Sequence, residues 1–175
     1  SVRSNKYFLR QDHEKFENGT VNYLNIPAIT NGLDYINSIS ITNISCRIKE
    51  LCGLFLQKIQ SLVHGNGLPL VKLYGPKHTQ NRGGTFLMNF FDVEGRGYPF
   101  CYIEQLASAE GISIRTGCFC NPGIDELNND ISEDELREYF ATRSNGDSAD
   151  MMQFLSRSRG AVRVSFGIPT TTTDI

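Results

Sequence analysis

Hydrophobic residues recur at helical spacing over the first third of the chain. Asn25 and Pro27 are typical of a helix start, and an apolar stripe at intervals of three and four follows them. A longer stripe predicts a second helix over about residues 44–62, with two glycines beyond its end. Cys52 lies on this second stripe, so it is expected to be a packing residue. The stripes comprise Ile26, Ile29, Leu33 and Ile36, and then Ile44, Ile48, Leu51, Cys52, Phe55, Ile59 and Leu62.

Shorter apolar runs, most of them alternating with polar residues, predict four strands, over residues 70–74, 84–91, 112–117 and 161–166. In the last strand, Val162 and Val164 share one face while Arg163 lies on the other. Between the second and third strands, the pattern predicts a helix over Pro99 to Glu110, ended by Gly111.

These elements predict an α/β domain of the α+β small-domain kind, in which helices pack on one face of a mostly antiparallel sheet of about four strands. The opposite face carries Arg115 and Arg163 and is expected to be unusually exposed. The first twenty residues are expected to be irregular. We expect residues 1–40 to be a connecting segment and residues 41–175 to form the small domain.

An acidic, polar segment at about residues 124–160 interrupts this pattern and is predicted to be a surface insertion. Ser132 and Glu135 have the spacing of a capping box for a short helix that runs through Phe140. A further helix is expected around Met151 to Leu155.

Composition narrows the possible functions. The chain has 175 residues, of which 39% are hydrophobic, enough for one domain with a normal core. Seventeen basic and 19 acidic side chains, without a basic run, leave no charged surface suited to nucleic acid. No apolar run approaches the roughly 20 residues that cross a bilayer, and no signal-like segment is visible. Five irregularly spaced cysteines fit a reducing compartment, so a cytoplasmic location is expected.

Candidate chemistry gathers at residues 115–123, Arg-Thr-Gly-Cys-Phe-Cys-Asn-Pro-Gly. Cys118 and Cys120 follow a predicted strand, where functional thiols are often carried, and Arg115 could favour the nucleophilic thiolate. Two ordinary buried small residues are the alternative. Arg163, fixed on a strand, could grip a carboxylate with its planar fork or could simply face solvent.

A metal site is a second hypothesis for the paired thiols. Tetrahedral zinc needs four ligands, commonly as two Cys-x2-Cys pairs, and this chain has one Cys-x-Cys. Cys46 and Cys52 lie on one helix about 240° apart and do not converge. The sequence therefore predicts no metal site. A non-catalytic module that dimerises or docks on another molecule is a third hypothesis.

Several strings, in order along nearly the whole chain, resemble the C-terminal part of class V pyridoxal-phosphate enzymes, which have fold type I. These are His13 through Asn22, Leu73 through Pro76, Arg115-Thr116-Gly117 with Cys120, and Val162 through Ser165. Within the class, Gly117 through Gly123, followed by a long insert before Val162, is most similar to the aminotransferase-like domain of molybdenum cofactor sulfurases.

This resemblance implies a cysteine desulfurase that takes sulfur from L-cysteine, with pyridoxal 5'-phosphate as the electron sink and a protein persulfide as intermediate. By alignment Cys120 would be the persulfide carrier, and Cys118 an assisting neighbour. Arg163 would bind the substrate carboxylate and Arg115 would line the same pocket. Gly19 and Thr20 would reach the cofactor phosphate of the opposite subunit, which implies a homodimer. A protein or cofactor would accept the sulfur, and under the third hypothesis the chain would only dimerise or dock on that acceptor.

One feature of the resemblance is missing from this sequence. In such enzymes the lysine that binds the cofactor lies in a large N-terminal domain, and none of the motifs of that domain is visible here. The chain starts in a polar stretch and stops at a cap-like Thr/Asp signal, so it is expected to be a fragment that shows no turnover alone.

Overall fold

The computed structural model describes residues 7–17, 19–143, 145–146, 148–155 and 160–175. The chain divides into two compact units, residues 1–44 and 45–175. The first contains the short 3-10 helix η1 (Asp12–Phe16), where an irregular stretch was predicted, and α1 (Ala28–Ile39). The helix predicted after Asn25 is confirmed, with Pro27 as its N-cap.

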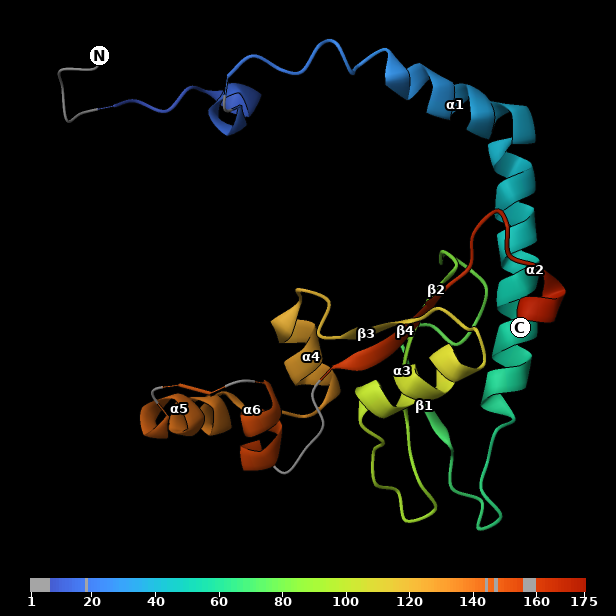
Figure 1. Ribbon diagram of the computed structural model, residues 1–175, viewed down its shortest axis with the longest axis vertical. Coiled ribbons are helices and arrows are strands. Elements are labelled where there is room, and N and C mark those ends of the chain that lie inside the picture. Colours follow the sequence, from blue (N-terminus) through green and yellow to red (C-terminus); the bar gives the residue numbers. More distant parts are fainter. Residues whose placement is uncertain (1–6, 18, 144, 147, 156–159) are drawn as a thin grey trace. The chain divides into compact units, whose positions relative to one another are not determined.

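The second unit contains the sheet and the remaining helices (Figure 1). The elements are α2 (Ile41–Gln60, which begins in the first unit), β1 (Val71–Tyr74), β2 (Thr85–Phe90), α3 (Phe100–Ala109), β3 (Arg115–Gly117), α4 (Pro122–Asn128), α5 (Glu133–Thr142), α6 (Ser148–Leu155), β4 (Ala161–Ser165) and the 3-10 helix η2 (Thr172–Asp174). In the described residues, no helix is both long and apolar enough to span a membrane.

The four strands form one antiparallel sheet in the order β1-β2-β4-β3, which confirms the predicted architecture. Strand β3 is shorter than expected. Residues 112–117 were predicted to be extended, but the Ile112 N–H donates to the Ala107 carbonyl at 2.8 Å and so continues the C-terminal cap of α3. Only the three residues opposite Ala161 to Arg163 pair with a neighbouring strand.

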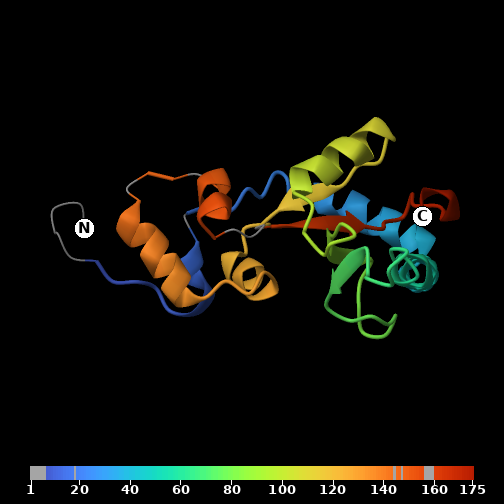
Figure 2. The ribbon, with the colours of Figure 1, turned by 90° about the horizontal axis from the view of Figure 1, so that it is seen from below.

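Register and burial define the covered face of the sheet. Phe86 of β2 is opposite Val164 of β4 and Met88 is opposite Val162, so the four side chains share one face of the sheet. They pack with Cys52 of α2, which is 1% exposed and confirms its predicted core position. Helix α3 lies along β3 and β4, as Figure 2 shows, and adds apolar side chains to the same core.

The segment between β3 and β4 builds a second small core of its own. Ser132 accepts a hydrogen bond from the Glu135 N–H, and the Glu135 carboxylate accepts one from the Ser132 N–H, so the predicted capping box starts α5. Helix α6 confirms the helix expected near Met151 to Leu155. The buried residues of this second core are Ile131, Tyr139, Met151 and Leu155. Helix α4 was not predicted, although Pro122 at its first position is a common start.

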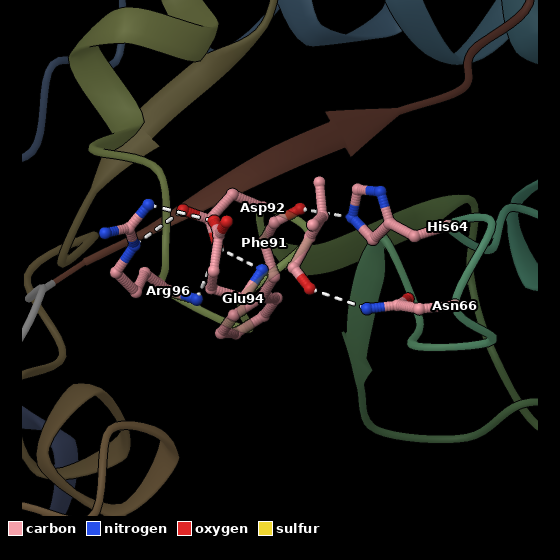
Figure 3. A network of polar contacts seen from close by, with 7 residues as sticks. His64, Asn66, Phe91, Asp92, Glu94 and Arg96 are labelled. Atoms are coloured by element: carbon pink, nitrogen blue, oxygen red, sulfur yellow. Dashed lines mark hydrogen bonds and ion pairs between the residues drawn. The ribbon is translucent and has the colours of Figure 1, made fainter.

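A network of polar contacts fixes the turn after β2 (Figure 3). His64 Nε2 lies 2.9 Å from the Phe91 carbonyl, and the Asn66 amide donates to the Val93 carbonyl at 2.7 Å. Asp92 accepts hydrogen bonds from the backbone and guanidinium of Arg96, each at 2.8 Å. Burial opposes ionisation of Asp92, but these hydrogen bonds and the Arg96 charge together hold its pKa below the usual value.

Candidate functional site

Two arginines lie opposite each other on the face of the sheet that α2 and α3 leave uncovered. Arg115 of β3 and Arg163 of β4 are paired across the strands, on the face opposite Val162 and Thr116. Like charges directly opposite each other destabilise a sheet, so the arrangement favours an anion that neutralises both. Thr116 points the other way and donates to the Glu104 carboxylate of α3 at 2.8 Å.

Arg163 is less accessible than the sequence led us to expect. The open face was predicted to be unusually exposed, and this holds for Arg115 but is wrong for Arg163. The Phe119 ring covers its guanidinium, with 5.1 Å between Arg163 Cζ and the ring centroid. Arg163 Nε is buried and has no hydrogen-bond partner among the residues that the structure describes. A buried donor without a partner is costly and is a natural place for a ligand acceptor.

Both candidate thiols lie in a tight turn directly after β3. Cys118 and Cys120 are exposed, and the Asn121 N–H donates to the Cys118 carbonyl at 3.0 Å. The two central residues are left-handed, Phe119 with φ 55° and Cys120 with φ 56°, as in a type I′ turn. Such conformations are disfavoured for side chains of this kind and are concentrated at functional sites. The predicted loop is therefore a defined turn that presents two thiols.

The base of this turn is packed tightly against the end of the insertion. Gly117 and Gly160 both have positive φ, 104° and 81°. A Cβ added at Gly160 would lie 2.9 Å from the carbonyl carbon of Gly117 and 3.0 Å from Phe100 Cε1. Only glycine permits this approach, which holds the start of β4 against the start of the turn at residues 118–121, called the thiol turn below.

The other cysteines are placed differently. Burial raises the pKa of the Cys52 thiol, although the charge of Arg82 opposes this, so Cys52 stays a neutral packing group. Cys46 and Cys101 are exposed on α2 and α3. All five cysteines lie within the described ranges and all are unpaired. Those ranges contain no group of three or more His, Cys, Asp or Glu side chains arranged to hold a metal ion.

Of the six predicted site residues, four lie together in the second unit: Arg115, Cys118, Cys120 and Arg163. The other two, Gly19 and Thr20, belong to the first unit. Both are exposed, and Gly19 has a φ of 130°, a conformation that glycine adopts readily.

A cavity of about 690 Å³ lies elsewhere on the open face, between the sheet and the insertion. Lys72, Tyr74 and Asn89 line it from the strands, and Asp130 and Gln153 from the insertion. The Asn89 amide lies 3.2 Å from Tyr74 Oη, 3.3 Å from Asn129 Oδ1 and 3.4 Å from the Gly160 carbonyl. Asn89 thus ties both ends of the insertion to β2.

Comparison with known proteins places this fold and site in a family. The profile of the aminotransferase class-V family matches residues 1–175. The chain belongs to this family. The match covers the thiol turn, both arginines and the segment with Gly19 and Thr20, and it confirms the relationship that the sequence motifs indicated.

Within the class-V family, the chain is similar to molybdenum cofactor sulfurases. It is 35% identical over 166 residues to the protein from Arabidopsis thaliana, covering 92% of this chain and 20% of that protein. It is 33% identical over 183 residues to the Drosophila melanogaster protein (97% and 23%) and 29% identical over 168 residues to the human protein (93% and 19%). The chain thus spans about a fifth of the length of these curated relatives.

A solved structure shares the fold. The apo structure of a cysteine desulfurase from Thermococcus onnurineus NA1 superposes with a TM-score of 0.56 at 20% sequence identity, covering 96% of this chain and 32% of that chain. This likeness supports the α/β architecture of a class-V enzyme.

Two residues of the open face make tertiary contacts that the sequence did not predict. Phe119 lies between two cysteines in the sequence. Its contact with Arg163 depends on a turn conformation that no periodic pattern predicts. Asn89 lies on the open face of β2, and its link to the insertion depends on a loop 40 residues away. A polar amide directly between the apolar residues Met88 and Phe90 is the one signal that could have drawn attention to Asn89.

Proposed function

We propose that the full-length protein that carries this chain is a pyridoxal-phosphate-dependent cysteine desulfurase of the sulfurase type. The observation that carries this proposal is the juxtaposition of Arg163 and the turn that presents Cys118 and Cys120. The Nε of Arg163 is buried, and within the described part of the chain it has no hydrogen-bond partner. The carboxylate of an amino-acid substrate would accept hydrogen bonds from Arg163, while the side chain of the substrate would lie next to a cysteine thiol. The class-V family and the similarity to molybdenum cofactor sulfurases support the same activity.

The chemical roles follow from the residue types. Arg163 binds the substrate carboxylate through two in-plane N–H groups, and Arg115 adds positive charge on the same face. Gly19 and Thr20 offer an exposed backbone amide and hydroxyl that suit the cofactor phosphate of the opposite subunit in a homodimer. Pyridoxal phosphate, when bound, supplies the electron withdrawal that weakens the carbon–sulfur bond of L-cysteine.

Cys120 acts as the nucleophile in this scheme. Its thiolate attacks the substrate sulfur, an S–S bond forms, and the bond between that sulfur and the substrate Cβ breaks. The electron pair remains on the carbon, which takes up a proton, so that L-cysteine and the Cys120 thiol become alanine and a Cys120 persulfide. The exposure of Cys120 leaves the outer sulfur open to an acceptor protein or cofactor, and Cys118 is close enough in sequence to assist this transfer. The proposal includes a cytoplasmic location, because unpaired cysteines are typical of proteins in a reducing compartment.

The test uses the full-length protein loaded with pyridoxal phosphate and incubated with L-cysteine. Alanine release and sulfur bound to each cysteine, located by peptide mass spectrometry, are measured for the wild type, Cys120→Ser and Cys101→Ser. Cys101 is the matched control because it is also exposed but lies on α3. We expect Cys120→Ser to reduce alanine release to background and Cys101→Ser to leave it unchanged. Undiminished alanine release in Cys120→Ser would rule out Cys120 as the acceptor.

The role of Arg163 is tested separately. The Gln amide in Arg163→Gln can keep one hydrogen bond to the carboxylate, so the loss of the other charge-assisted bond is expected to lower kcat/KM for L-cysteine about 10-fold to 100-fold. Most of that loss is expected in KM. An unchanged KM would show that the carboxylate binds elsewhere.

A further inference from the structure

Phe119 is the physical link between the two groups on which the proposed function depends. It lies between the two thiols in the chain, and its partly buried ring contacts the guanidinium of Arg163 on a different strand. Neither the family relationship nor the proposed chemistry assigns it a role.

The backbone of the turn gives this contact a mechanical meaning. Phe119 and Cys120 occupy left-handed conformations in sequence, which nearby contacts must hold in place. One such contact is the hydrogen bond from Asn121 to Cys118, which closes the turn on itself. The Phe119 ring on Arg163 is different, because it joins the turn to the rigid strand β4.

The geometry of a guanidinium allows both partners of Arg163 at once. An aromatic ring uses the face of the cation, whereas a carboxylate uses the N–H groups at its edge. The ring also keeps water from one face of the charge, which strengthens pairing at the edge. Phe119 can therefore remain in contact with Arg163 while a carboxylate is bound.

We propose that Phe119 is a positioning residue, and that the contact of its ring with Arg163 sets the position of the Cys120 thiol relative to the bound substrate carboxylate. This inference rests on the proposed function, since it takes Arg163 as the carboxylate site and Cys120 as the nucleophile. A fixed distance between these two groups matters because attack requires the reacting atoms to be held in near-contact geometry.

Two variants separate this role from simple packing. Phe119→Tyr keeps an aromatic face, whereas Phe119→Leu keeps apolar bulk without one. In the full-length protein loaded with pyridoxal phosphate, we expect Phe119→Leu to lower kcat for alanine release about 10-fold with little change in KM, and Phe119→Tyr to stay within about threefold of the wild type. This split differs from that of Arg163→Gln, which acts on KM.

A second readout needs no turnover. In the cofactor-free full-length protein, alkylation by iodoacetamide is followed at Cys120 and, as internal reference, at the exposed Cys101. We expect Cys120 to react at least about threefold faster in Phe119→Leu, because the loss of the ring contact frees the turn. Cys120 in Phe119→Tyr, and Cys101 in all three proteins, are expected to react at wild-type rates.

Several outcomes overturn the inference. Equal kcat and equal Cys120 alkylation in Phe119→Leu and the wild type would show that the ring contact positions nothing. Equal impairment of the Leu and Tyr variants, or altered alkylation with unchanged kcat, would reduce Phe119 to a packing residue. If the wild type itself places no sulfur on Cys120, the proposed function fails, and the alkylation comparison still decides whether Phe119 restrains the turn.

Discussion

Replacement of Gly160 by alanine tests the closest backbone approach next to the thiol turn. With φ at 81°, Gly160 occupies a region that costs an L-residue about 1 kcal/mol or more. The new Cβ would also lie 2.9 Å and 3.0 Å from the carbonyl carbon and Cα of Gly117, and 3.0 Å from Phe100 Cε1. Two of these neighbours are backbone atoms and cannot rotate away. Forcing them apart is comparable to overpacking a core, which costs about 1–3 kcal/mol.

The expected loss in the free energy of unfolding is therefore about 2–4 kcal/mol for Gly160→Ala. Gly111→Ala is the matched control, because Gly111 has a similar φ of 71° but, apart from its own chain neighbours, no atom of the described residues lies within 4 Å of the added Cβ. It is expected to lose only the conformational part, about 1 kcal/mol. The difference between the two variants isolates the steric cost.

Equilibrium urea unfolding of the purified chain, followed by far-UV circular dichroism with linear extrapolation, measures both losses. The slope with urea should be the same in the two variants, so that the midpoints report stability. In the full-length protein, Gly160→Ala should also lower alanine release, since displacement of Gly117 moves the thiol turn that follows it. Equal destabilisation of the two variants would refute the argument that the approach of Gly160 to Gly117 is tight.

Three further predictions address the core, a helix cap and the turn after β2. Phe86→Ala removes a ring that is 1% exposed at the centre of the sheet and should cost about 3–5 kcal/mol in urea unfolding. Ser132→Ala removes the capping hydroxyl of α5 and should cost about 1 kcal/mol, seen as faster amide exchange in the first turn of that helix. Asp92 has a lowered pKa in the folded state, so its ionisation stabilises the fold above its unfolded pKa of about 3.9, and this stabilisation is lost as pH falls through the lower folded pKa. Asp92→Asn should therefore flatten the acid limb of the stability profile, and an unchanged acid limb would show that Arg96 does not stabilise the ionised Asp92.

Repeated local patterns explain why most of the fold could be predicted. The alternation that put Phe86 and Met88 on the covered face is a property of any extended strand, and the stripe that carries Cys52 is a property of any helix. The capping box of α5 is likewise local, since its two partners are three residues apart. The prediction of a strand over residues 112–114 was wrong, because a local sequence pattern does not show whether a neighbouring strand lies close enough to pair.

The site divides in the same way. The sequence by itself determined that two thiols follow a strand, that Arg163 lies on the face opposite Val162, and, through its motifs, that the chain resembles class-V enzymes. Only the tertiary structure decided that β3 lies beside β4, which brings Arg115 opposite Arg163. It also places the Phe119 ring on the guanidinium of Arg163. The physical reason is that periodicity fixes which face a side chain occupies, whereas the pairing of β4 with β2 and β3, and the contact of Phe119 with Arg163, join residues more than 40 positions apart.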